Sequence, residues 1–269
     1  MSSTTTTLST SSLACPLSRR LAAYTKEAKY DFLGRLRLPV YSASTILFPV
    51  MFYTLFGLLL NRGQSNQGVS VSTYLLASYG TFGVMGAALF GFGVGVAMER
   101  GLGWLQVKRA SPMPPPAYFM AKLTTSMAFS AIIVLLLMTL GVLFGGVHLA
   151  PIEALKLLLT LVIGAICFCA MGLAIGSLAG PNSAPAIVNL LYLPMSFASG
   201  LWIPINLLPR FLQKVAPLLP PFHLGQLALG VVGANREPAA NHWGALLGFT
   251  LVFLGIARIG FQRDERQTG

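Results

Sequence analysis

Apolar residues run through this chain in long segments that charged residues interrupt. No Asp, Glu, Lys or Arg occurs between Arg37 and Arg62, between Arg62 and Glu99, or between Lys122 and Glu153. A helix needs about 20 mostly apolar residues to cross a hydrocarbon layer of about 30 Å. Each of these three intervals therefore predicts one membrane-spanning helix.

Two further intervals continue the pattern. The interval that follows Lys156 is long enough for two helices, which Gly180-Pro181-Asn182 divides. The interval that follows Glu237 is long enough for one more helix. The chain is therefore predicted to be an all-α integral membrane protein with six transmembrane helices.

The interval between Lys214 and Arg236 is also uncharged and long enough to cross, but it has Pro217, Pro220 and Pro221 near its start. Proline removes a backbone donor and breaks a helix. A crossing there would also put the basic C-terminal tail on the outer side. We therefore expect an outer, partly inserted re-entrant hairpin before the last span.

These patterns divide the chain into a tail, an interfacial helix, a membrane domain and a second tail. The expected ranges are a disordered tail at 1–18, a cytoplasmic interfacial helix at 19–37, a transmembrane domain at 38–262 with spans at about 38–60, 73–98, 121–147, 152–178, 184–204 and 241–261, and a cytoplasmic tail at 263–269.

The interfacial helix is predicted from amphipathic spacing between residues 19 and 37. Apolar residues recur there with helical spacing, and basic residues lie mostly between them, which is typical of a helix in the membrane interface. It either anchors the first span or docks a partner. Its candidate residues are Tyr24, Lys26, Lys29, Phe32 and Arg35.

Composition and charge agree with a membrane protein. Charged residues make up 9% of the chain, against roughly 25% in soluble domains. The net charge is +11, and with the N-terminus inside, thirteen of the 18 Lys and Arg residues lie on the cytoplasmic side. This is the distribution of the positive-inside rule, so both termini are predicted to be cytoplasmic. The basic balance requires no nucleic acid.

Glycines recur at four-residue spacing in several predicted spans. Such pairs let helices approach closely in lipid, so they predict a packed bundle and are compatible with a dimer. The pairs are Gly91/Gly95, Gly141/Gly145, Gly172/Gly176/Gly180 and Gly244/Gly248.

Several chemical signatures are missing from the sequence. It contains no Gly-Lys dipeptide, and therefore no phosphate-binding loop of the GxxxxGK[ST] type. His148, His223 and His242 lack metal-ligand spacing. The predicted span interiors carry no ionisable residue, which argues against a proton-driven carrier. We expect no metal, no directly bound cofactor and no enzyme activity.

The cytoplasmic loop ERGLGWLQVKRASPMPPPAY, residues 99–118, combines charges, Trp104 and a proline stop. It is either a charged connector or a short helix that docks into a partner. We expect Glu99 to pair with Arg100 or Arg109, and Trp104 and Leu105 to be the apolar anchor. Lys108 and Arg109 could then meet acidic groups of the partner.

Three groups of residues resemble the permease subunits of ABC type-2 exporters. The first is Glu99-Arg100, Gly101, Gly103, Leu105, Ser111-Pro112 and Lys122; the second is Gly200-Leu201-Trp202-Ile203-Pro204 with Leu208-Pro209; the third is Pro220-Pro221-Phe222-His223. The resemblance covers roughly residues 20–262. Leu229 stands where many members carry Arg, which puts a fixed role for that arginine in doubt.

The resemblance implies an ATP-driven exporter of the bacterial inner membrane. Such a permease works with a second copy of itself or a close homologue, and with two copies of a cytoplasmic ABC ATPase that binds the ATP and Mg. The substrate would be an amphipathic drug-like, lipid-linked or glycan molecule. The alternatives are an ATP-independent secondary carrier and a non-transporting membrane scaffold.

The resemblance also implies roles for particular residues. ATPase coupling would fall to Glu99, Arg100, Gly101, Trp104, Leu105, Lys108, Arg109, Ser111 and Pro112; the substrate pathway between second and fifth spans would include Tyr79, Phe82, Met85, Asn189, Tyr192 and Phe197; and the outer re-entrant motif would comprise Pro220, Pro221 and His223.

Overall fold

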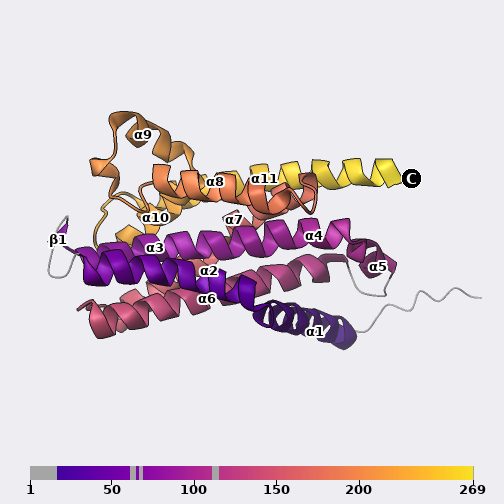
Figure 1. Cartoon of the computed structure of the whole chain (residues 1–269), viewed down its shortest axis with the longest axis horizontal. Helices are drawn as coiled ribbons and strands as arrows, with labels where there is room; N and C mark the ends of the chain where they lie inside the picture. The colour runs from indigo at the N-terminus through magenta and orange to yellow at the C-terminus, as the bar shows by residue number, and fades with distance from the viewer. Residues whose placement is uncertain (1–16, 61–64, 67–68, 111–114, 269) are drawn as a thin grey trace, which may run out of the picture.

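The computed structural model describes residues 17–60, 65–66, 69–110 and 115–268. Long helices lie side by side along one axis of the molecule (Figure 1). The elements are α1 (Leu17–Leu36), α2 (Pro39–Phe52), η1 (Tyr53–Leu59), β1 (Ser65–Asn66), β2 (Val69–Ser70), α3 (Val71–Ala88), η2 (Leu89–Val94), α4 (Gly95–Gly101), α5 (Trp104–Ala110), α6 (Pro115–Phe144), α7 (Pro151–Leu178), α8 (Ala184–Ala198), η3 (Ile205–Leu207), α9 (Arg210–Val215), η4 (Ala216–Leu218), α10 (Pro220–Val231) and α11 (Ala239–Thr268).

Within the described residues, five helical segments are long and apolar enough to cross a membrane. They are Tyr41–Leu59, Val71–Gly101, Pro116–Phe144, Pro151–Leu178 and Ala239–Arg263. These five correspond to five of the six predicted spans, so a mostly helical membrane protein is confirmed.

The remaining predicted span, 184–204, is the fifth along the chain and contains the shorter helix α8. Its 15 residues rise about 22 Å at 1.5 Å per residue, less than the hydrocarbon thickness. It ends at Ala198 because Gly200 has a positive φ of 76°, which suits a residue just after a helix end. The segment 205–236 holds only short helices, of which α10 is the longest in this part of the described chain.

The helix that contains the third predicted span, 121–147, begins before that span. Its first residue is Pro115. Proline suits the first turn of a helix, where its missing N–H is not needed. Lys122 lies inside α6 and is 1% exposed, because it is paired, as described below.

The segment α3 with η2 is the centre of the bundle. Residues 72–89 are all buried, and this segment contacts α2, α6, α7, α8 and α10. A helix that is apolar on every face belongs in an interior. Small residues such as Gly80, Gly83 and Gly86 let the neighbouring helices approach from several sides.

The glycines of α7 pack against the π-helical turn η2. A Cβ at Gly172 would lie 2.9 Å from the backbone nitrogen of Gly93, and a Cβ at Gly176 would lie 2.7 Å from the oxygen of Gly93. The two backbones therefore touch where α7 crosses η2. By contrast, a Cβ at Gly244 or Gly248 of α11 would meet nothing within 4 Å.

We expect Gly176→Val to lower the free energy of unfolding by about 1–3 kcal/mol, because the added atoms force backbones apart in a packed interior. The matched control is Gly248→Val, which adds the same side chain in open space on α11. The unfolding midpoint of each variant in detergent measures the difference. Equal midpoints for the two variants would show that this crossing is not tightly packed.

The two ends of the bundle differ. The C-terminus, α1 and α5 lie at one end, whereas β1, α9 and α10 lie toward the other (Figure 1). The first end is called the α5 end below, and the second is called the α9 end.

Candidate functional site

A buried ionic cluster joins α1, α4 and α6 at the α5 end. Lys122 Nζ lies 3.0 Å from Asp31 Oδ1 and 2.6 Å from Glu99 Oε1. Arg35 Nε donates to Asp31 Oδ2 at 3.2 Å. Two cations and two carboxylates therefore pair where three helices meet, and Glu99 Oε2 is left without a hydrogen-bond partner among the described residues.

Aromatic rings stabilise the two cations of this cluster, and the two cations stabilise the charged form of Asp31. Lys122 Nζ is 5.0 Å from the ring centre of Tyr118, and the Arg35 guanidinium is 5.6 Å from that of Tyr41, which are cation–π distances. Burial raises the pKa of Asp31, but attraction to Arg35 and Lys122 outweighs burial and holds its pKa below the usual value. Asp31 is therefore held as a carboxylate.

Glu99 pairs with Lys122, and Arg100 has a different role. The Arg100 guanidinium donates to the backbone oxygens of Ser177 and, at 2.8 Å, Ala179. Cations suit the C-terminal end of a helix, where carbonyls lack partners, and these two carbonyls lie at the end of α7. Glu99 thus pairs with Lys122, a partner that was not expected, and the side chain of Arg109 lies outside the described residues. In the sequence, Lys122 marks a span boundary and belongs to the first group of resembling residues, but no ionic partner is predicted for it.

The short helix α5 lies beside this cluster. Lys108 Nζ is 2.5 Å from Glu27 Oε1 on α1 and 4.6 Å from the ring centre of Tyr118. Lys108 therefore has an acidic partner within its own chain, which the sequence did not indicate. A cavity of about 520 Å³ lies between α1, α4 and α5, lined by Glu27, Tyr30, Asp31, Glu99, Trp104 and Lys108.

Trp104 is the first residue of α5 and is 54% exposed. Leu105 is half-buried and packs against the main core. Of the two expected anchors, Trp104 is thus the one available to a partner. Gly101 packs against the ring of Pro181, where a Cβ would lie 2.5 Å from Cγ.

For the predicted interfacial helix and the rest of the coupling set, the structure gives mainly the exposure of the side chains. Tyr24 and Phe32 of α1 are half-buried, whereas Lys26 and Lys29 are exposed. Arg109 is in α5. The predictions for Ser111 and Pro112 lie outside the described residues.

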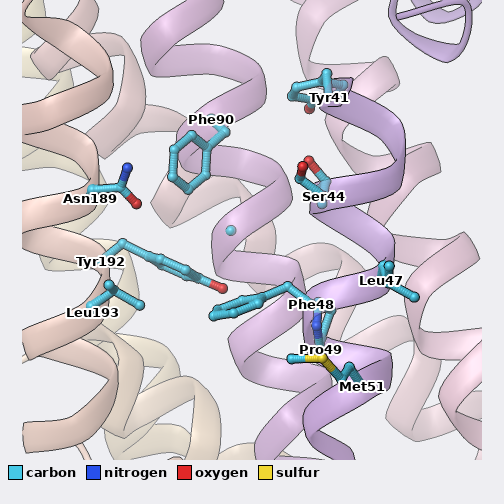
Figure 2. A pocket seen from close by; sticks show the side chains of 12 residues that line it. Tyr41, Ser44, Leu47, Phe48, Pro49, Met51, Phe90, Asn189, Tyr192 and Leu193 are labelled. Atoms are coloured by element: carbon cyan, nitrogen blue, oxygen red, sulfur yellow. The ribbon is translucent and has the colours of Figure 1, made fainter. Parts of the chain in front are cut away.

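A second cavity, of about 500 Å³, opens between α2 and α8. Figure 2 shows Asn189 and Tyr192 on one side, and Tyr41, Ser44 and Phe48 on the other. Gly86 and Phe90 complete its wall between these two helices. Aromatic and aliphatic side chains dominate, and a few hydroxyl and amide groups add hydrogen-bonding positions.

The predicted pathway residues divide between this cavity and the core. Asn189 and Tyr192 line the cavity, and Phe197 of α8 is 39% exposed. Tyr79, Phe82 and Met85 of α3 are at most 1% exposed and face neighbouring helices.

Tyr192 connects the cavity to the central helix. Its hydroxyl donates to the Phe82 carbonyl at 3.1 Å, and its ring stacks on Phe82 with centroids 4.7 Å apart. A Cβ at Gly86 would lie 2.8 Å from the same hydroxyl oxygen. The wall of the cavity is thereby fixed to α3, the element that continues into Glu99.

The outer motif brings together two histidines that the sequence treated as dispersed. Pro220 and Pro221 are buried at the start of α10. His223 Nδ1 lies 3.0 Å from His242 Nδ1 of α11, and its Nε2 lies 2.9 Å from the Pro217 oxygen. Leu229, also on α10, is 5% exposed, so an arginine there would require a buried partner.

Five residues line or build these sites but were not predicted to do so: Glu27, Asp31, Tyr41, Ser44 and Lys122. Asp31 and Arg35 show an i, i+4 acid–base spacing on an otherwise basic helix, which is a usable signal. No sequence pattern places Lys122 beside them, because that contact depends on how α1 folds against α6.

Comparison with known proteins places this architecture in a family. Residues 27–232 match the ABC-2 type transporter family. The chain is 25% identical over 221 residues to "Putative transport permease YvfS" of Bacillus subtilis (strain 168), covering 82% of this chain and 89% of that protein. Residues 27–232 include the ionic cluster, α5, and the helices α2 and α8 that line the second cavity. The chain therefore belongs to the ABC-2 type transporter family and is a transporter membrane subunit.

Proposed function

We propose that this chain is the permease of an ATP-driven exporter, working as two copies, or with a close homologue, on two cytoplasmic ABC ATPase subunits. Family membership implies an ABC ATPase partner and a membrane location. The observation that carries the proposal is the exposed Trp104 on α5, mounted beside an ionic cluster that is continuous with the central helix.

The geometry supports a route for coupling. Lys108 ties α5 to Glu27 of α1, while Glu99 at the end of α3, η2 and α4 is held by Lys122. A displacement of α5 is thus passed to α1 and to the central segment. Through the Tyr192–Phe82 contact, the same movement reaches the wall of the cavity between α2 and α8, which is called the lateral cavity below.

The lateral cavity supports an amphipathic substrate. Its lining is largely apolar, with Ser44, Thr45, Asn189 and the Tyr41 and Tyr192 hydroxyls as polar positions. Ligand sites typically combine a hydrophobic wall with few polar groups that orient the ligand. A drug-like or lipid-linked molecule entering from the bilayer fits this better than a free glycan.

We further propose that the α5 end is cytoplasmic, in a bacterial inner membrane. Thirteen of 18 basic residues gather on that side of the predicted topology. A membrane-impermeant thiol reagent applied to intact cells should label Asn235→Cys and should not label Arg263→Cys. The reverse labelling would invert the orientation.

The test of the function is reconstitution. The purified chain should hydrolyse no ATP alone, and its complex with a co-expressed ABC ATPase should export an amphipathic dye from proteoliposomes only when ATP and Mg²⁺ are supplied on the α5 side. Hydrolysis by the chain alone would contradict the proposal. Transport that needs an ion gradient and no ATP would favour a secondary carrier, and failure to bind or stimulate any ATPase would favour a scaffold.

A further inference from the structure

Four polar groups form a continuous chain of contacts toward the α9 end, where α10 meets α11. His223 Nε2 lies 2.9 Å from the backbone oxygen of Pro217, and His223 Nδ1 lies 3.0 Å from His242 Nδ1. His242 Nε2 in turn lies 3.0 Å from Glu237 Oε2, an ion-pair contact whose angle is outside hydrogen-bond geometry. This chain of contacts links η4, α10, α11 and the loop before α11, and neither coupling nor the lateral cavity uses it.

The two ends of this chain determine how many hydrogens it holds. A backbone oxygen and a carboxylate oxygen can only accept, so the Nε2 atoms of His223 and His242 each carry a hydrogen. The two Nδ1 atoms face each other, so one donates, the other accepts, and the contact between them holds a single hydrogen. The four ring nitrogens therefore carry three hydrogens, whereas two neutral imidazoles carry two. The contacts thus require one extra proton on the two histidines.

The surroundings place this extra proton on His242. Its ring is buried, and its Nε2 lies against the Glu237 carboxylate, which is the charge that favours an imidazolium. Burial lowers the pKa of His223, and nearby His242 lowers it further, whereas the contacts with Pro217 and Glu237 raise it. The net direction of the shift is downward, so His223 is the neutral member of the pair.

Other charged groups near His242 oppose any further positive charge. Lys156 of α7 and Arg236 of the loop before α11 line a cavity of about 410 Å³ together with His242 and Glu237. Glu153 of α7 also lines this cavity, but its Oε2 caps the helix by accepting from a backbone N–H at 3.0 Å. Glu237 is therefore the carboxylate placed to hold the extra proton.

We propose that His223 and His242 form a proton-binding site that locks α10 to α11 while it holds one extra proton, and that a second proton opens this lock. A second proton would put a hydrogen on both Nδ1 atoms, which are only 3.0 Å apart, and would add a second positive charge beside the first. Loss of the first proton would leave a ring lone pair facing either another lone pair or the carboxylate. The lock is therefore strongest between these two protonation steps.

The acid limit of the lock follows from the lowered pKa of His223. A histidine in an unfolded chain has a pKa of about 6.5, so below that pH the unfolded chain takes up the second proton more readily than the locked one. The stability that the lock contributes is therefore lost as the pH falls through the lowered pKa of His223. With the α9 end outside the cell, as proposed above, an acidic medium would release α10 from the last span. The proton count itself does not depend on that orientation.

Nitrogen NMR counts the hydrogens directly. The full-length chain is labelled with nitrogen-15 histidine and studied in detergent in a His148→Gln background, which leaves His223 and His242 as the only histidines. At neutral pH, three of their four ring nitrogens should give the chemical shift of a protonated nitrogen and one that of a bare nitrogen. Two protonated and two bare nitrogens would mean a neutral pair and would overturn the proposal.

Two carboxylate variants test which group holds the extra proton. In Glu237→Gln the new amide can donate to His242 Nε2, so neutral imidazoles satisfy every contact and the count should fall to two hydrogens. Glu237 is 61% exposed, so the fold is retained. The matched control is Glu153→Gln, which removes another carboxylate of the same cavity and should leave three hydrogens. An equal loss in Glu153→Gln would assign the charge to the general field of the cavity and refute this site.

The opening of the lock is measured from the pH dependence of the thermal unfolding midpoint. When the pH falls from about 7 to about 5, the midpoint of the unmodified chain should fall by about 2–4 °C more than that of His223→Gln. Glutamine can still donate to the Pro217 oxygen but takes up no proton, so a purely structural role of His223 predicts equal slopes. Equal slopes would therefore contradict the opening step. Neither measurement involves an ATPase or a transported molecule, so a failure here leaves the proposed function untouched.

Discussion

Lys122→Met is expected to lower the free energy of unfolding by about 3–5 kcal/mol, the typical cost of removing one partner of a buried ion pair. Lys122 is 1% exposed and contacts both Asp31 and Glu99. Methionine fills a similar volume, so the loss is that of the charge rather than of packing. Asp31 retains Arg35, but Glu99 loses its ion pair with Lys122. The unfolding midpoint in detergent measures the change.

The control for this variant is Lys29→Met on α1, where the side chain is exposed and the effect should be within about 0.5 kcal/mol. The double variant Lys122→Met with Glu99→Gln should recover part of the loss, because the unpaired carboxylate is then removed. If Lys122→Met were no more destabilising than Lys29→Met, the cluster would not stabilise the fold.

The membrane helices were predictable because their signal is composition over long segments. Five of the predicted spans correspond to spanning helices within a few residues. The sequence and the structure differ where a local interaction or a backbone angle decides where a helix begins or ends. At α6 the charge of Lys122 indicated a boundary, but pairing with Asp31 and Glu99 lets the lysine lie inside the helix. At α8 the uncharged segment continues past residue 198, but Gly200 with its positive φ ends the helix.

Glycine spacing illustrates what a one-dimensional pattern lacks. Gly172/Gly176 and Gly244/Gly248 have the same spacing, but in a single copy of the chain only the first pair faces a neighbouring backbone. The pattern indicates that a close approach is available; which helix comes close depends on packing. The two ion pairs of Lys122 and the contact of His223 with His242 share this property, since the partners are 19 to 91 residues apart.

The candidate sites were predicted in part. The exposure of Trp104 agrees with the expected anchor, and Asn189 and Tyr192 line the lateral cavity. The family resemblance implies a pathway role for Tyr79, Phe82 and Met85, because it places the pathway along the second and fifth spans. The second span is covered on every side, so the same residues form the core. Their role in transport stays a prediction about the assembled transporter.

The other large expected effect concerns Trp104. We expect Trp104→Ala to abolish export while the protein still inserts and folds. The side chain is 54% exposed at the start of α5, so its truncation removes little internal packing. An aromatic anchor in an interface typically contributes about 2 kcal/mol or more, which corresponds to a loss of roughly 30-fold in affinity for the ATPase.

Two control variants distinguish the loss of a docking anchor from the general effect of truncating an exposed side chain. Leu102→Ala removes a 71% exposed apolar side chain just before α5 and should leave complex formation unchanged. Lys108→Ala removes the pair with Glu27, whose side chains are 27% and 23% exposed, and a partly exposed pair of this kind contributes at most about 1 kcal/mol. Its effect should therefore be mild.

The measurement is co-purification of the ATPase and dye export for all three variants at equal membrane abundance. Loss of both in Trp104→Ala alone supports α5 as the docking helix. If Trp104→Ala kept normal complex formation and export, α5 would be a charged connector. The exposed face of α1, with Lys26, Lys29 and Tyr30, would then be the docking surface, because it is the other element at the α5 end that shares the ionic cluster with the central helix.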